Sequence, residues 1–185
     1  MTLPRPAVLY SEDEIARRIA EVGAEITAEF GGKEIRVVGL MKGCLIFMGD
    51  LIRALPLDLS VDLLRVSSLR EGPGSPRTEI VYSTTLPCEG RDVLLLNDII
   101  DTGITLSFVL DHMREHQPRS LKVCALIDRP TARKIDVQPD WALFRLREAL
   151  GERYVVGYGL DCAENYRGLP YIGVIPRPAS PARGA

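Results

Sequence analysis

The first periodic stretch of the chain predicts an amphipathic helix over residues 11–30. Apolar side chains recur there at helical spacing, at Ile15, Ile19, Val22 and Ile26. Ser11 and Glu14 have the spacing of a capping box, in which each side chain accepts a hydrogen bond from the backbone N–H of the other residue. The Gly31-Gly32 pair that follows is a typical helix end.

Beyond residue 32, short runs of Val, Leu and Ile alternate with helical patterns. We predict helices over 44–55 and 105–116, and strands over 35–40, 59–67, 91–97, 121–127, 154–158 and 171–175. The strand runs are apolar at consecutive positions, which is typical of strands covered on both faces. This alternation predicts an α/β fold, in which helices flank a parallel sheet.

Two segments fall outside the alternation. Residues 69–78 hold two glycines and two prolines among charged residues, so we expect a mobile loop that bridges two strands of an antiparallel excursion. The last residues are rich in proline and show no apolar periodicity, which predicts a disordered tail over 177–185. A chain of 185 residues is the size of one ordinary domain, so residues 1–176 are expected to form a single domain.

Composition narrows the function classes. Hydrophobic residues make up 46% and charged residues 26%, as in globular proteins. With 23 Lys and Arg against 25 Asp and Glu, the net charge of -2 disfavours binding to nucleic acid through its phosphates. The longest apolar runs are far shorter than the ~20 residues that span a bilayer, so no membrane partner is expected.

The cysteines and the N-terminal residues bear on the compartment. The four cysteines have neither zinc-knuckle nor Cys-x-x-Cys spacing; they are Cys44, Cys88, Cys124 and Cys162. Cys44, Cys124 and Cys162 lie in apolar surroundings, and we interpret them as reduced thiols in or near the core, with disulfide pairing in a secreted protein as the alternative. The N-terminal residues lack the pattern of an export signal, so a cytoplasmic location is expected.

The strongest chemical signal lies where the strand 91–97 ends. Asn97 and Asp98 follow four apolar residues there. The turn after them opens the next helix and consists of Asp101, Thr102, Gly103, Ile104 and Thr105. Open α/β sheets bind ligands at this place, and backbone N–H groups at a helix start form a cradle for phosphate. A simpler interpretation is that Asp101 or Thr102 only caps the helix. Because that leaves Asp98 unexplained, the carboxylate pair indicates that a cation or a proton is handled beside the phosphate.

Other catalytic motifs are absent or incomplete. The chain has no G-x-x-x-x-G-K-[ST] and no G-x-S-x-G, and Gly157-Tyr158-Gly159 lacks the third glycine of the dinucleotide fingerprint. His112 and His116 are four residues apart on a predicted helix, where a solvated face is favoured over a shared metal. ATPase, dehydrogenase and serine-hydrolase functions are therefore disfavoured.

Residues 97–105 closely resemble the phosphoribosyl pyrophosphate signature of the type I phosphoribosyltransferases. Further segments are similar to the hypoxanthine-guanine branch, especially its bacterial members: 41–43, 66–68, 126–130, 154–161, 165–167 and 169–173. The resemblance covers about residues 10–176. It implies the type I phosphoribosyltransferase fold, a central, mostly parallel sheet flanked by helices, with a small hood and a mobile loop.

The same resemblance implies an activity in purine salvage. A purine nitrogen of hypoxanthine or guanine attacks the anomeric carbon of phosphoribosyl pyrophosphate, which gives IMP or GMP and releases pyrophosphate. Mg²⁺ is the implied cofactor, and a homodimer or homotetramer is the implied assembly. The partners are then a purine base and phosphoribosyl pyrophosphate.

Roles for individual residues follow from the resemblance alone. Asp101 matches the catalytic carboxylate that accepts the purine N7 proton, and the loop from Asp101 through Thr102, Gly103 and Ile104 to Thr105 matches the 5′-phosphate cradle. Lys42 and Gly43 match a loop that contacts pyrophosphate, often through a cis peptide, and Arg167 matches a second pyrophosphate contact. The remaining implied contacts are Asp98 and Asp161 to Mg²⁺, Asp161 and Val155 to the base, and Tyr154 stacked on it.

Three positions depart from the family pattern. Asn97 stands in place of Glu and can bond ribose hydroxyls without a charge, so weaker ribose and Mg²⁺ affinity is expected. Arg129 stands in place of the Lys that contacts purine O6, and a guanidinium can still donate to that oxygen. Leu69 stands in place of the Tyr of the mobile loop, which removes a hydroxyl from the lid.

These departures leave a second hypothesis open, a nucleotide-binding regulatory or weakly active paralogue of the same fold. Calorimetry that finds nucleotide binding without turnover would favour it. A third hypothesis, a nucleic-acid-binding regulator, is disfavoured because the chain lacks a basic stripe.

Overall fold

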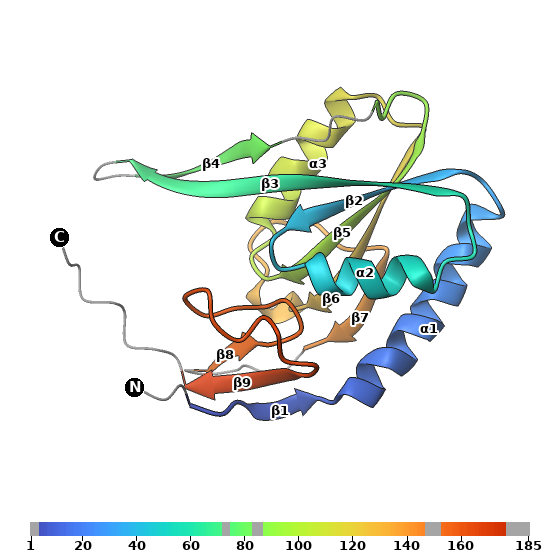
Figure 1. Ribbon diagram of the computed structural model, residues 1–185. Coiled ribbons are helices and arrows are strands. Elements are labelled where there is room, and N and C mark those ends of the chain that lie inside the picture. Colours follow the sequence, from blue (N-terminus) through green and yellow to red (C-terminus); the bar gives the residue numbers. More distant parts are fainter. Residues whose placement is uncertain (1–3, 72–74, 83–86, 147–152, 177–185) are drawn as a thin grey trace.

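A computed structural model of the chain describes residues 4–71, 75–82, 87–146 and 153–176, and their side chains except those of 67–71 and 75–82. Helices and strands alternate along most of this part of the chain (Figure 1). The helices are α1 (Glu12–Phe30), α2 (Leu45–Arg53) and α3 (Ile104–Glu115), with one short 3-10 turn, η1 (Pro130–Ala132). The strands are β1 (Ala7–Tyr10), β2 (Ile35–Met41), β3 (Leu59–Glu71), β4 (Ser75–Tyr82), β5 (Asp92–Ile100), β6 (Ser120–Asp128), β7 (Trp141–Arg145), β8 (Arg153–Val156) and β9 (Ile172–Pro176).

Helix α1 begins and ends as predicted. The Ser11 N–H donates to Glu14 Oε2 at 2.8 Å, and the Glu14 N–H donates to Ser11 Oγ at 3.3 Å, so the capping box is complete. The chain leaves the helix through Gly31, whose φ of 56° is a left-handed conformation that suits glycine.

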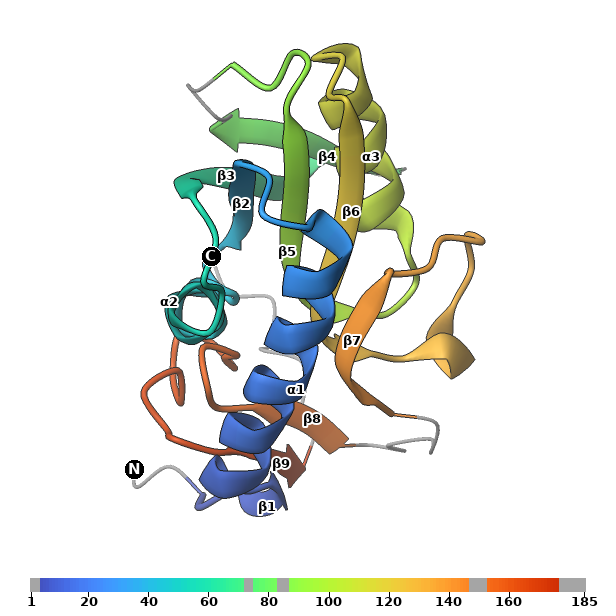
Figure 2. The same ribbon diagram turned by 90° about the vertical axis from the view of Figure 1, so that its right-hand side faces the viewer.

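The central sheet has the strand order β4-β3-β2-β5-β6-β7, and every neighbouring pair except β3–β4 is parallel. Adjacent residues of one strand pack into different cores. Leu94 and Leu96 of β5 join the core under α1 and α2, whereas Leu95 joins the core under α3. Figure 2 shows these helices on the two sides of the sheet. The α/β class is therefore confirmed. The strands with consecutive apolar positions are covered on both faces, as predicted.

A second, smaller sheet has the strand order β1-β9-β8, with antiparallel pairing throughout. It is the hood that the resemblance implied. The apolar runs over 154–158 and 171–175, which the alternation placed with the parallel sheet, form β8 and β9 of this hood. Strands β1 and β7 were not predicted, because each is four or five residues long and partly exposed, which leaves a weak apolar signal.

The predicted antiparallel excursion is formed by β3 and β4. The two strands are longer than expected, since the backbone of Glu71 still pairs with that of Ser75. The loop predicted over 69–78 therefore contains strand at both ends, and residues 72–74 lie outside the described part. The predicted tail at 177–185 also lies outside it.

The thiols agree with the expectation of unpaired cysteines. All four are free, and Cys44, Cys88 and Cys124 are buried. Burial raises the pKa of the Cys44 and Cys124 thiols well above the ordinary value, so these two are poor nucleophiles. Among the helices of the described residues, none combines the length and apolar character needed to cross a bilayer.

A charged cluster joins the first residues of β5 and β6. Asp92, which is 2% exposed, accepts hydrogen bonds from Arg119 Nε at 3.1 Å and from Ser120 Oγ at 2.6 Å. The hydrogen bond from Arg119 is the main cause that lowers the pKa of Asp92 to about 2, and the Ser120 hydroxyl adds to this effect. These contacts link the first residues of β5 and β6, the two strands whose carboxyl ends carry the candidate site.

Replacing Asp92 with Asn should lower the free energy of unfolding by about 1–2 kcal/mol at pH 7. The native carboxyl has a pKa below that of the unfolded chain, so its contribution is present above about pH 4 and is lost as the pH falls toward 2. Urea unfolding at pH 7, 5 and 3 measures the difference between the two proteins, which should shrink at pH 3.

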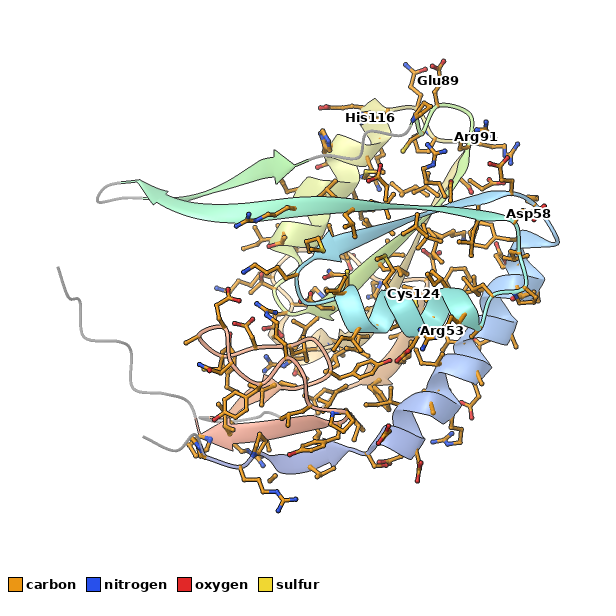
Figure 3. The ribbon with its side chains drawn as sticks, viewed as in Figure 1. Arg53, Asp58, Glu89, Arg91, His116 and Cys124 are labelled. Carbon is orange, nitrogen blue, oxygen red and sulfur yellow. The ribbon has the colours of Figure 1, made fainter. Side chains whose placement is uncertain are left out.

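The control for this prediction is Asp58→Asn, because Asp58 is exposed at the end of the molecule where β3 starts (Figure 3). It should change the unfolding free energy little at any of the three pH values. An Asp92→Asn difference that stayed constant from pH 7 to pH 3 would contradict the assignment.

Candidate active site

Loops that follow three parallel strands meet at the carboxyl edge of the central sheet. Lys42 and Gly43 follow β2, Asp101 follows β5 and Arg129 follows β6. The chain between β8 and β9, residues 157–171, lies beside these loops and connects the edge to the hood (Figure 1). Because open α/β sheets bind ligands outside the carboxyl ends of their strands, this edge is the candidate site.

The start of α3 is built to leave its first amides without a side-chain cap. Its N-cap is Gly103, with a φ of 82°, whereas α1 is capped by a serine. Thr102 Oγ1 lies 3.4 Å from the N–H of Ile104, a long contact. The N-cap residue is therefore Gly103 and neither Asp101 nor Thr102, and a helix start of this kind suits an anion.

A cavity of about 260 Å³ adjoins these amides. Its lining runs along the signature segment: Asn97, Asp98, Ile99, Ile100, Asp101, Thr102, Gly103, Thr105 and Leu106. Asn97 is 5% exposed, at the end of the buried part of β5. Ile104 does not line the cavity, and its side chain points outward with 45% exposure, so only its backbone can serve a ligand there.

The loop after β6 braces the segment that lines this cavity. The N–H groups of Lys134 and Ile135 donate to the Thr102 carbonyl at 2.9 and 3.1 Å. A Cβ atom on Gly103 would lie 2.7 Å from Val137 Cγ1 and 2.9 Å from the Ile135 carbonyl oxygen. Glycine is thus required at 103 by both its backbone angle and its neighbours.

Gly43 is enclosed between β5 and residues 157–171, which we call the hood loop. A Cβ atom there would lie 1.7 Å from Asp98 Oδ2, and one on Gly159 would lie 2.3 Å from the Gly43 carbonyl oxygen. The peptide bond between Met41 and Lys42 is cis, as the resemblance implied. The absence of two side chains therefore lets three segments meet at one point.

The Asp98 carboxyl has an unusual environment. Burial raises its pKa to about 6, and the nearby negative charge of Asp161 adds to the rise. The N–H of Ile99, which donates to Asp98 Oδ1 at 2.7 Å, and the charge of Arg167 lower the pKa. A cation bound beside Asp98 and Asp161 would relieve this repulsion.

A second cavity, of about 150 Å³, lies between β5, β6 and β8. It is lined by Asp98, Ile99, Asp101, Arg129, Arg153, Tyr154, Val155, Leu160 and Asp161. Arg129 Nη1 donates to Asp101 Oδ1 at 2.8 Å, and the Arg129 Nε is buried without a hydrogen-bond partner in the described part of the chain. The exposed face of Tyr154, which is 45% accessible, and the buried Val155 complete a pocket suited to a flat ligand with an acceptor atom.

The hood loop brings Arg167 to the same edge as Lys42. Arg167 donates to Asp161 at 2.8 Å and to the Gly159 carbonyl at 2.8 Å. Lys42 and Arg167 both contact Glu164, at 2.9 and 3.2 Å. Sequence reasoning did not single out Glu164, although its spacing of three residues from both Asp161 and Arg167 was a visible signal.

The structure thus brings the predicted site residues together at one edge, in two adjoining cavities and the loops beside them. A larger cavity, of about 590 Å³, lies elsewhere, between α1, α2 and residues 168–170. Its lining is mostly apolar, and it includes neither the carboxylates of the signature segment nor the cations beside them, Lys42, Arg129 and Arg167. Chemistry rather than size therefore identifies the candidate site.

Comparisons with known proteins agree with this assignment. A family model of the phosphoribosyl transferase domain matches residues 8–161. The chain is 42% identical over 169 residues to a hypoxanthine-guanine phosphoribosyltransferase of Bacillus subtilis, covering 91% of this chain and 92% of that one.

Solved structures are similar over the same range. A crystal structure of a hypoxanthine-guanine phosphoribosyltransferase from Bacillus anthracis superposes with a TM-score of 0.83 at 35% identity, covering 91% of this chain and 97% of that one. One of a hypoxanthine phosphoribosyltransferase from Staphylococcus aureus gives 0.83 at 36% identity, with coverages of 91% and 90%. The chain therefore belongs to the phosphoribosyltransferase family, in its hypoxanthine-guanine branch.

Proposed function

We propose that this protein is a purine-salvage transferase, which moves the 5-phosphoribosyl group from phosphoribosyl pyrophosphate to hypoxanthine or guanine. The products are IMP or GMP and pyrophosphate. The observation that carries the proposal is the adjacency of the two cavities, one with the uncapped start of α3 and one with Asp101, Arg129 and Tyr154. One cavity suits a phosphate and the other a flat base, and Asp101 and Asp98 line both.

The 5′-phosphate is proposed to bind at the start of α3. The first N–H groups of that helix and the hydroxyls of Thr102 and Thr105 would donate to its oxygens. Asn97 would bond the ribose through its amide. Lys42 and Arg167 would bind the pyrophosphate, with Gly43 allowing the backbone to approach it closely.

The purine is proposed to stack on Tyr154 with its edge toward Val155 and Arg129. A purine nitrogen forms a bond to the anomeric carbon while the bond from that carbon to pyrophosphate breaks, and pyrophosphate leaves with the electron pair. The proton on purine N7 passes to the Asp101 carboxylate, which lies in the same pocket. The buried Nε of Arg129 lacks an acceptor, which O6 of a 6-oxopurine would supply.

Asp98 and Asp161 fit a divalent cation. They line one cavity, and their mutual repulsion helps to raise the pKa of Asp98. Mg²⁺ is commonly held by one or two carboxylates together with substrate phosphates and water, which is the donor set available here. When bound, Mg²⁺ would offset negative charge on the ribosyl pyrophosphate.

Two further properties implied by the resemblance belong to this proposal. The protein is proposed to act in the cytoplasm and to assemble as a homodimer or homotetramer. Sedimentation equilibrium of the purified protein measures the second property, and a monomeric mass at all concentrations would contradict it.

A panel of the four common purines tests the proposed function. With phosphoribosyl pyrophosphate and Mg²⁺, purified protein should form nucleotide from hypoxanthine or guanine and little from adenine. Absence of nucleotide from every 6-oxopurine would overturn the proposal. If calorimetry then found GMP binding, the regulatory paralogue would be favoured, as the uncharged Asn97 suggests.

Replacing Asp101 with Asn should lower kcat by at least about 10²-fold, because the proton acceptor is lost. Folding should be intact, since the Asp101 side chain is 45% exposed in a loop and its ion pair contributes little to stability. Steady-state kinetics and a thermal unfolding curve measure the two effects. Turnover within threefold of the original protein would show that Asp101 is not the base.

Replacing Arg129 with Met should raise KM for hypoxanthine by about tenfold or more, since a charged hydrogen bond to O6 is lost. KM for phosphoribosyl pyrophosphate should change much less, and Arg129→Lys should fall between the two. Lys134→Met is the matched control, because Lys134 is an exposed cation five residues along the same loop. An equal rise in both KM values would argue against a contact to the base.

Removal of Mg²⁺ by a chelator should abolish nucleotide formation, and added Mg²⁺ should restore it. Asp98→Asn should need a higher Mg²⁺ concentration for half-maximal rate, because one of the two carboxylates is lost. A Mg²⁺ titration of the initial rate measures both. Full activity in the presence of chelator would contradict the proposed metal dependence.

A further inference from the structure

The carboxylate of Glu164 lies between the two cations assigned to pyrophosphate. Lys42 Nζ is 2.9 Å from its Oε1, and Arg167 Nη2 is 3.2 Å from its Oε2. Each carboxylate oxygen therefore faces one cation. A phosphate group bound between Lys42 and Arg167 would pair with the same two cations.

The backbone of the hood loop places Glu164 there. Ala163 and Glu164 have φ values of 50° and 63°, a left-handed conformation that costs energy in residues other than glycine. The Glu164 N–H donates to Asp161 Oδ2 at 2.8 Å, which holds this conformation. The same aspartate that contacts Arg167 thus also sets the position of Glu164.

The two cations depend on Glu164 to different degrees. Arg167 is anchored independently by Asp161 and by the Gly159 carbonyl, each at 2.8 Å. Lys42 contacts Glu164 from a 46% exposed position, and the Glu164 side chain itself is 66% exposed. Glu164 can therefore turn into solvent without moving Arg167, and Lys42 is then available to another anion.

We propose that Glu164 is a placeholder anion, which pyrophosphate displaces from Lys42 and Arg167 on binding and which returns as pyrophosphate leaves. The inference rests on the proposed function for the assignment of these two cations to pyrophosphate. Glu164 is a positioning residue in this scheme and touches no reacting atom. When Glu164 returns, its carboxylate again balances the positive charge of Lys42 and Arg167 as pyrophosphate departs.

The charge state of Glu164 supports this competition. The hydrogen bond from Lys42 and then that from Arg167 hold the pKa of Glu164 below its usual range. The residue is thus an anion at neutral pH, as displacement by another anion requires. Exposed ion pairs of this kind are individually weak, so a pyrophosphate with several negative oxygens can replace them.

Replacing Glu164 with Gln tests the inference, because the shape is kept and the charge is lost. Calorimetric titration with pyrophosphate in the presence of Mg²⁺ should give a dissociation constant about fivefold lower for Glu164→Gln than for the original protein. Product inhibition by pyrophosphate should strengthen, and KM for phosphoribosyl pyrophosphate should fall, by a similar factor. KM for hypoxanthine should stay the same.

The matched control is Glu34→Gln. Glu34 forms an exposed ion pair with Arg91 at 2.8 Å, and Arg91 lies at the other end of the molecule from the hood loop (Figure 3). This variant should bind pyrophosphate as the original protein does. The shorter side chain of Glu164→Asp cannot reach both cations, so this variant should tighten pyrophosphate binding by a smaller factor. It replaces Glu164→Gln in the test if that variant does not fold.

The result that overturns the inference is pyrophosphate binding to Glu164→Gln that is equal to, or weaker than, that of the original protein. Its failure is distinct from that of the proposed function. A protein that makes IMP but shows no tightening in Glu164→Gln loses the inference alone. A protein that makes no nucleotide, yet binds pyrophosphate more tightly as Glu164→Gln, loses the proposed function and keeps the competition between the two anions.

Discussion

The close approach around Gly43 is the constraint on which the candidate site depends. The Asp98 carboxylate packs against one side of this glycine, and the backbone at Gly159 packs against its carbonyl. Strand β2, strand β5 and the hood loop therefore meet with no room for a methyl group. This contact aligns the loop at Lys42 and Gly43, which is proposed to bind pyrophosphate, with strand β5. It also ties the hood, which belongs to a separate sheet, to the carboxyl edge of the central one.

Charge in the site is arranged in pairs. Asp101 faces Arg129, Asp161 faces Arg167, and Glu164 spans Arg167 and Lys42. Each cation expected to hold a substrate group is thus compensated by a carboxylate of the protein itself. On the proposed function, substrate binding at this edge would exchange one set of ion pairs for another, so its net free energy would be smaller than the contacts alone would indicate.

Much of the architecture could be predicted from apolar periodicity and caps. Helix α1 and the buried strands β2, β5 and β6 have long, strong patterns, and Ser11 with Glu14 marked the helix start correctly. Strands β1 and β7 were not predicted, because short, partly exposed strands have few apolar positions that could reveal them. The hood could not be separated from the central sheet by pattern, since strand pairing depends on partners far away in the sequence.

The site was predicted to a similar extent. The structure brings the residues named by the resemblance together at one edge of the sheet, and their individual roles stay predictions. Ion pairs such as Glu164 with Lys42 join residues 122 positions apart, and no local pattern encodes them. The N-cap at Gly103 was not predicted, because the contacts of Ile135 and Val137 that require a glycine come from the next loop.

The brace between the loops after β5 and β6 links the two halves of the site. Arg129 N–H donates to the Ile100 carbonyl at 3.0 Å, and Lys134 and Ile135 donate to Thr102. The loop proposed to present Arg129 to the base and the loop proposed to hold the phosphate are therefore joined by backbone hydrogen bonds. If a ligand at either loop displaced it, these hydrogen bonds would carry the displacement to the other loop, and by reciprocity each ligand would change the affinity of the other by the same factor.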